Sequence, residues 1–113
     1  MADTVAIVAN KDHVLESGSL TATAYFRLSG AADTPADVWY RVQCLTTNQE
    51  LTGWTSVSAA SSVSITLSGV NTDIKDASNK YERKQLQVSA DMDASDEVRG
   101  ALVYTVENLA GAT

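Results

Sequence analysis

The acidic segment 91–97 holds the residues whose types and spacing come nearest to a metal site. Its oxygen-bearing side chains are those of Asp91, Asp93, Ser95, Asp96 and Glu97. Alternating oxygen ligands are typical of the opening of a calcium-binding loop, which then needs glycine at its sixth position and glutamate at its twelfth. Asp96 and Leu102 stand at those two positions here. The segment is therefore predicted to be a solvated hairpin loop, and the alternative is a calcium site completed by Asp33 or Asp37.

The single histidine, His13, and the single cysteine, Cys44, are the other candidates for chemistry. A nucleophilic cysteine needs a base within hydrogen-bonding distance. His13 lies in a polar turn, however, whereas Cys44 alternates with apolar strand residues, so we expect a solvated histidine and a small buried thiol. Two such residues cannot supply a zinc site. Glycine-rich phosphate loops, nucleophile elbows and paired-carboxylate motifs are also missing from the sequence. We therefore assign no catalytic, cofactor-binding or metal-binding residues and predict that the chain is not an enzyme.

Aromatic side chains offer a third kind of chemistry, because Trp39, Tyr25 and Tyr104 could stack on a sugar ring. Aromatic residues on strands more often lie in a core or a subunit interface. Segment 38–67 holds both tryptophans and the cysteine. We expect its tryptophans to pack two sheets together there.

The elements that must position these residues are strands. Residues 20–29 alternate with period two, which predicts a strand with one buried face; the inward set is Leu20, Ala22, Ala24, Phe26 and Leu28. Further strands are expected at 4–9, 38–46, 51–57, 62–68, 84–90 and 98–109. Residues 13–16 form either a short strand or part of a turn, and Gly53 indicates a β-bulge before Trp54.

Segment 73–80 is either a turn of helix capped by Asn71 or Thr72, or an irregular crossover. Seven or eight strands separated by turns at intervals of about 8–12 residues are typical of an all-β antiparallel sandwich. The sequence therefore predicts such a sandwich, with at most one short helical turn, as a single domain over residues 1–113. Residues 1–16 are expected to form an extended amino-terminal arm or an edge strand.

Composition narrows the range of partners. With 8 basic and 14 acidic residues, the net charge is −6. This balance disfavours nucleic acid and anionic membranes, unless the basic residues gather on one face; the candidates for such a patch are Arg27, Arg41, Arg83, Lys84 and Arg99. One cysteine allows no intrachain disulfide. Since we find neither a signal peptide nor a run of about 18 apolar residues, we expect synthesis in a bacterial cytoplasm without export.

The run GWTSVSAASSVSITLSG, followed by Tyr81 and LQVSADM, resembles the middle of a fibronectin type III or immunoglobulin-like domain. In that family a tryptophan-bearing segment leads to a strand, a turn ending in tyrosine and an alternating strand. The segment between Leu67 and Tyr81 is longer than the family's turn. The resemblance implies an immunoglobulin-like sandwich, and a module that binds carbohydrate or a host surface is one function it allows.

A second resemblance covers most of the chain. The order VWYRVQCLTT, W-T-x-V-S-x-A-S-S-V-S-I-T-L, YERKQLQVSAD and Y-T-V-E-N-L-x-G is similar to small proteins encoded among the structural genes of tailed bacteriophages and prophages. It implies a virion protein, which we expect to be a capsid decoration (cement) protein, with a minor tail or neck protein as the alternative. The expected partner is the major capsid protein or another virion protein, and the expected assembly is a homo-oligomer, with a trimer favoured.

Overall fold

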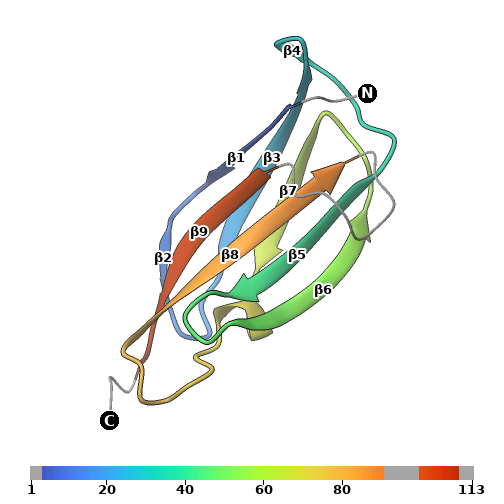
Figure 1. The fold of residues 1–113 in the computed structure, drawn as a ribbon. Helices are drawn as coiled ribbons and strands as arrows, with labels where there is room; N and C mark the ends of the chain where they lie inside the picture. The colour runs from blue at the N-terminus through green and yellow to red at the C-terminus, as the bar shows by residue number, and fades with distance from the viewer. Residues whose placement is uncertain (1–3, 91–99, 110–113) are drawn as a thin grey trace.

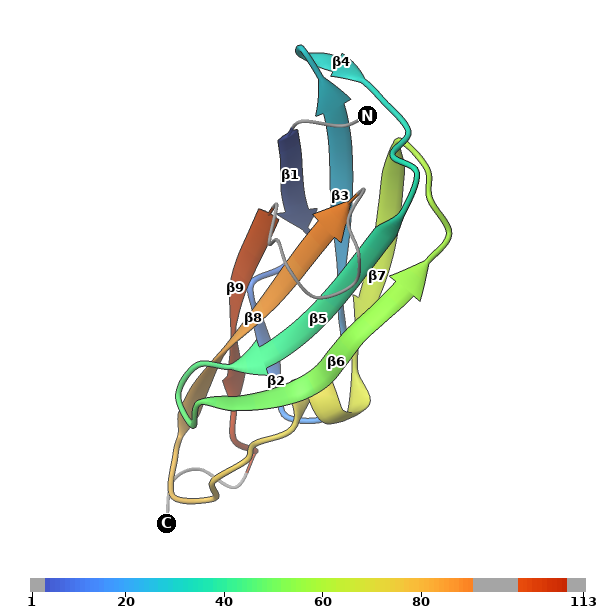
Figure 2. The same cartoon turned by 45° about the vertical axis from the view of Figure 1, so that its right-hand side comes forward.

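The computed structural model describes residues 4–90 and 100–109, and these residues are almost entirely β-structure. They contain nine strands and one 3-10 turn: β1 (Thr4–Ala9), β2 (His13–Leu15), β3 (Leu20–Leu28), β4 (Ala31–Ala32), β5 (Val38–Cys44), β6 (Gln49–Val57), β7 (Ser62–Leu67), η1 (Gly69–Thr72), β8 (Tyr81–Ala90) and β9 (Gly100–Glu107). Figures 1 and 2 show the strands arranged in two layers. The predicted all-β sandwich is confirmed.

One layer, here called the β3 sheet, contains β1, β3, β4 and β7, with β3 paired to all three of the others. The second layer, the β8 sheet, has the order β2-β9-β8-β5-β6. Its pairs are antiparallel except for β2 and β9, which run parallel. The first residues of the chain therefore supply an edge strand to each sheet, β1 to one and β2 to the other.

Side chains that alternate along facing strands make the core. In β3, Leu20, Ala22, Ala24 and Phe26 are buried as their alternation predicts, because this strand lies between β1 and β7 with one face on the core. Leu28 is exposed, since β3 continues there into its hairpin with β4. The β8 sheet adds a matching inner face of Val38, Val42, Leu86, Val88, Tyr104 and Val106.

Both tryptophans lie on the outer face of the β8 sheet, so the expectation that they join the two sheets was wrong. Trp39 and Trp54 are partly exposed, whereas their neighbours Val38 and Val42 face the core. Tyr40 packs against the core from the inner face. The interior is instead filled by the single phenylalanine, by Tyr104 and by aliphatic side chains.

Of the two alternatives for segment 73–80, the irregular crossover is confirmed, and the strand count exceeds the expected seven or eight. The 3-10 turn occupies Gly69–Thr72, and segment 73–80 is an irregular crossover to β8. Two very short strands, β2 and β4, raise the count above eight. The bulge predicted near Gly53 is confirmed, because Tyr40 pairs with Thr55 while Val42 pairs with Thr52.

Candidate functional site

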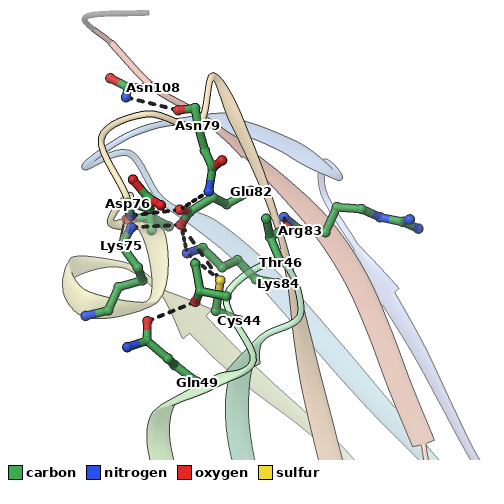
Figure 3. A network of polar contacts seen from close by, with 12 residues as sticks. Cys44, Thr46, Gln49, Lys75, Asp76, Asn79, Glu82, Arg83, Lys84 and Asn108 are labelled. Carbon is green, nitrogen blue, oxygen red and sulfur yellow. Dashed lines mark hydrogen bonds and ion pairs between the residues drawn. The ribbon is translucent and has the colours of Figure 1, made fainter. Parts of the chain in front are cut away.

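A cluster of ionisable side chains lies inside the sandwich, where β5 ends and β8 begins (Figure 3). Because Leu86 and Val88 point inward and side chains alternate along a strand, Lys84 and Glu82 point inward too. Cys44 on β5 pairs with Lys84, which in turn pairs with Tyr104 on β9. Three adjacent strands therefore bring a thiol, an amine and a phenol to one inner face, with a carboxylate beside them.

Glu82 is the centre of this cluster. Its side chain is fully buried and accepts hydrogen bonds from a cation, an amide, a thiol and two backbone N–H groups. The donors are Lys84 Nζ at 2.8 Å, Lys75 N at 2.8 Å, Asp76 N at 2.9 Å, Asn79 Nδ2 at 3.0 Å and Cys44 Sγ at 3.8 Å. The carboxylate thus fastens the crossover 73–80 to the end of the sandwich.

Two opposing effects set the protonation of Glu82. Burial would raise the pKa of its carboxyl, but the hydrogen bonds from Lys75 N, Lys84, Asn79 and Asp76 N outweigh it and lower the pKa from 4.5 to about 2. The carboxylate is therefore ionised beside the Lys84 ammonium, and neither side chain is exposed to solvent. A buried charge is tolerated only when it is paired and hydrogen-bonded, as both are here.

Tyr104 closes the other side of the cluster. Its hydroxyl donates a hydrogen bond of 2.6 Å to the carbonyl oxygen of Asn71 in η1. Burial, together with the neighbouring Cys44, raises the pKa of the Tyr104 phenol, so the hydroxyl keeps its proton. Asn71 also accepts a hydrogen bond from Thr52 Oγ1 on β6, which links the turn to the β8 sheet a second time.

The outer face of the β8 sheet is polar and aromatic. The Arg41 guanidinium lies 4.7 Å from the centre of the Trp54 ring and donates a hydrogen bond to Gln87. Gln87 donates in turn to Gln85 at 2.7 Å. At the β2 edge, His13 Nε2 lies 2.9 Å from a Glu107 carboxylate oxygen.

The outer face of the β3 sheet has a different character. It is made of small, hydroxyl-bearing and uncharged side chains, apart from Arg27 at one end. The set is Thr4, Ala6 and Val8 from β1, Thr21, Thr23, Tyr25 and Arg27 from β3, and Ser62, Ser64 and Thr66 from β7. Arg27 donates to the carbonyl oxygen of Gly30 in its own hairpin, at 3.2 Å. We call this surface, without Arg27 at its end, the uncharged face.

The calcium candidates Asp91, Asp93, Ser95, Asp96 and Glu97 lie outside the described residues. In residues 4–90 and 100–109, no group of three or more His, Cys, Asp or Glu side chains is placed to hold a metal ion. Cys44 is buried as expected, and His13 is exposed against Glu107 and Tyr81.

The alternative of an aromatic platform is not supported, because Trp39, Tyr25 and Tyr104 lie on three different faces of the two sheets. Trp39 lies on the outer face of the β8 sheet, Tyr25 lies on the uncharged face, and Tyr104 is in the core. The possible basic patch does not form around Lys84 either, since that side chain is in the interior.

Sequence reasoning missed the buried pair of Glu82 and Lys84. One signal could have found it: the alternation of Leu86, Val88 and Ala90, extended backward by two and four residues, places both charges on the inner face. Lys and Glu are almost never fully buried unless paired. The charges of Lys84 and Glu82 therefore argued against extending the inward alternation to these two residues.

No protein-family model and no curated protein matches this chain. Among solved structures, it is similar to the CARDB domain of the PF1109 protein from Pyrococcus furiosus, which was solved in complex with di-metal ions. The TM-score is 0.49 at 13% identity, over 93% of this chain and 90% of that one. Within the described residues, no helix has the length and apolar character to cross a membrane.

Proposed function

We propose that this protein is a non-enzymatic structural component of a tailed-phage virion, a decoration protein that binds the outside of the capsid. The observation that carries the proposal is the uncharged face of the β3 sheet. The phage setting rests on the sequence resemblance, and the mode of action rests on this surface.

The uncharged face stands out in a chain of net charge −6. Interface cores are depleted of charged residues, because burying a charge against a partner costs free energy unless it is paired. Across the three strands, Val8 pairs with Thr23, and Thr23 pairs with Ser64. A partner can cover this row without desolvating a charged group.

Most side chains on the outer face of the β3 sheet are also small, with Tyr25 and Arg27 as the exceptions. Thr23 Oγ1 and Ser64 Oγ lie 3.3 Å apart and hydrogen-bond across the strands. Their remaining donors and acceptors are open to a second surface. Tyr25, 40% exposed beside Ala6 and Ser62, supplies a large side chain of the kind enriched in interfaces.

The mechanism we propose is mechanical. A decoration protein that contacts two neighbouring capsomers adds apolar and hydrogen-bonded area to the shell, which opposes its expansion or rupture. A trimer at a local threefold axis would present three such faces at once, and their linkage would strengthen attachment beyond the affinity of a single face.

Co-sedimentation tests this proposal. Particles of the phage or prophage that encodes the chain are purified on a density gradient, and each fraction is probed for the protein. The proposal expects the protein in the particle fractions at a fixed ratio to the capsid protein. A protein found only in the soluble fraction would refute it.

One observation on the outer face of the β8 sheet favours a second candidate, a carbohydrate-binding module. Trp54 and Arg41 are stacked on the outer face of the β8 sheet, next to the Gln87 amide. Aromatic rings and amide groups are the side chains with which proteins hold sugar rings. Glycan binding that is lost in Trp54→Ala would support this candidate, while absence of binding to any glycan tested would remove it.

A further inference from the structure

The buried cluster holds a thiol and an amine within hydrogen-bonding distance. Lys84 Nζ lies 3.4 Å from Cys44 Sγ. The two residues come from adjacent strands and are directly paired across them. Neither has more than 1% of its surface exposed. Reacting atoms held about 3–3.5 Å apart in a fixed orientation gain a large rate advantage over the same groups in solution.

The third member of the cluster holds the amine in position. Glu82 Oε1 accepts a hydrogen bond of 2.8 Å from Lys84 Nζ. An amine is nucleophilic only in its neutral form, so the ammonium must first lose a proton to water. The cluster therefore contains an amine, a carboxylate that orients it and an oxidisable sulfur atom.

We propose that Cys44 and Lys84 form a reversible covalent cross-link when the thiol is oxidised by a peroxide. This inference goes beyond the proposed function and does not depend on it. In the first step, hydrogen peroxide oxidises the Cys44 thiol to the sulfenic acid and is reduced to water. In the second step, the Lys84 ammonium gives a proton to water that enters with the peroxide, and its nitrogen lone pair attacks Sγ.

The second step breaks the sulfur–oxygen bond and forms a sulfur–nitrogen bond. The departing hydroxide takes a second proton from the nitrogen and leaves as water. The protein loses two hydrogen atoms overall, and one peroxide becomes two waters. Sulfenic acids undergo this condensation with nitrogen nucleophiles, and thiols reverse it.

The position of the cluster allows a small oxidant to reach it. Cys44 is the last residue of β5, and the crossover 73–80 covers Glu82. Opening of this loop alone would admit peroxide, since local openings cost less free energy than global unfolding. The resulting bond would tie β5 to β8, two central strands of a chain whose single cysteine allows no internal disulfide.

The test is a peptide map of the folded protein after treatment with hydrogen peroxide. Trypsin normally cleaves after Lys84, and Cys44 lies in tryptic peptide 42–75. A bridge would block cleavage at Lys84, so the expected product joins peptide 42–75 to peptide 84–99 with a mass two hydrogen atoms below their sum. Dithiothreitol should restore the separate peptides and the free thiol.

Two controls complete the experiment. Cys44→Ser removes the sulfur atom and should give no cross-linked product. A dimedone-type reagent, which traps sulfenic acid, should decrease the yield of the cross-link because both reactions consume the same intermediate. Neither control removes a charge from the buried pair, so neither depends on a variant whose folding is in doubt.

The outcomes that contradict the proposal are equally specific. An unmodified thiol, a sulfinic or sulfonic Cys44 without a cross-link, or attachment to Lys75 or Lys80 would each overturn it. A bridge that carries an additional oxygen atom would contradict the direct sulfur–nitrogen bond.

Discussion

Glu82 and Lys84 form an ion pair in the protein interior, with 2.8 Å between Oε1 and Nζ and neither side chain exposed. They are two residues apart on β8, so both point to the same inner face. The pair is surrounded by hydrogen-bond partners, and it fixes the crossover that leads into the strand. Its energetic consequences can be measured directly.

Breaking this pair from the lysine side should strongly destabilise the fold. Lys84→Met leaves the Glu82 carboxylate buried without its cation, which typically costs about 3–5 kcal/mol of unfolding free energy. Urea denaturation followed by fluorescence would measure the loss. The matched control is Lys75→Met, because the Lys75 side chain is exposed and only its backbone N–H bonds to Glu82. A loss below about 1 kcal/mol in Lys84→Met would contradict the role given to the pair.

Stability should fall in acid because of Glu82. Its pKa is about 2 in the folded protein and 4.5 when unperturbed, so the unfolded state binds a proton more readily than the folded state. The stabilisation is therefore complete above about pH 5 and is lost as the pH falls toward 2, amounting to roughly 3 kcal/mol. Urea midpoints measured across this window should show the decline. In Glu82→Gln the decline should be shallower, and an identical slope in both proteins would count against the assignment.

The Tyr104 hydroxyl should contribute measurably to stability. Tyr104→Phe removes the donor to the Asn71 carbonyl and leaves that oxygen with one bond fewer, at a cost of about 1–2 kcal/mol. Thermal unfolding followed by circular dichroism would detect a lower melting temperature. Tyr81→Phe is the control, because Tyr81 is 47% exposed and its variant should unfold like the wild type. Equal effects of the two substitutions would show that the buried hydrogen bond is unimportant.

Chelation should leave the protein unchanged. The acidic segment lacks the glycine and the glutamate that a calcium loop requires. We therefore expect the same melting temperature with EDTA, with calcium and without either. A rise in melting temperature with calcium that Asp91→Asn and Asp93→Asn abolish would establish the site that the alternation of oxygen ligands suggested.

Period-two alternation predicted the sandwich well where only one face of a strand is apolar. Leu20 to Phe26 in β3 and Val63 to Leu67 in β7 are buried on alternate residues as expected. In β5 both faces carry apolar residues. Alternation therefore predicts that Trp39 and Leu45 share a face, but it does not determine whether that face points toward the core or outward.

The candidate site was harder to predict because it depends on pairing between strands. A buried lysine is acceptable only with a partner in place, and the partners of Lys84 include Cys44, 40 residues earlier in the chain. The parallel pairing of β2 with β9 likewise joins residues from opposite ends of the chain. Local sequence patterns do not show which distant residues will pair.

The proposed attachment to a virion through the uncharged face is tested most directly by introducing charged residues on that face. Val8→Lys combined with Ser64→Lys places two cations on either side of Thr23. The control, Gln85→Lys combined with Val103→Lys, adds the same charge to a paired position on the outer face of the β8 sheet. Both variants are first checked for wild-type thermal unfolding and are then mixed with particles that lack the protein.

Binding to these particles, measured as the fraction of protein that co-sediments, gives the decisive comparison. Attachment through the uncharged face predicts that the first variant stays in the supernatant while the control co-sediments as the wild type does. Binding of both variants at the wild-type level, or loss of binding in the control alone, would contradict it.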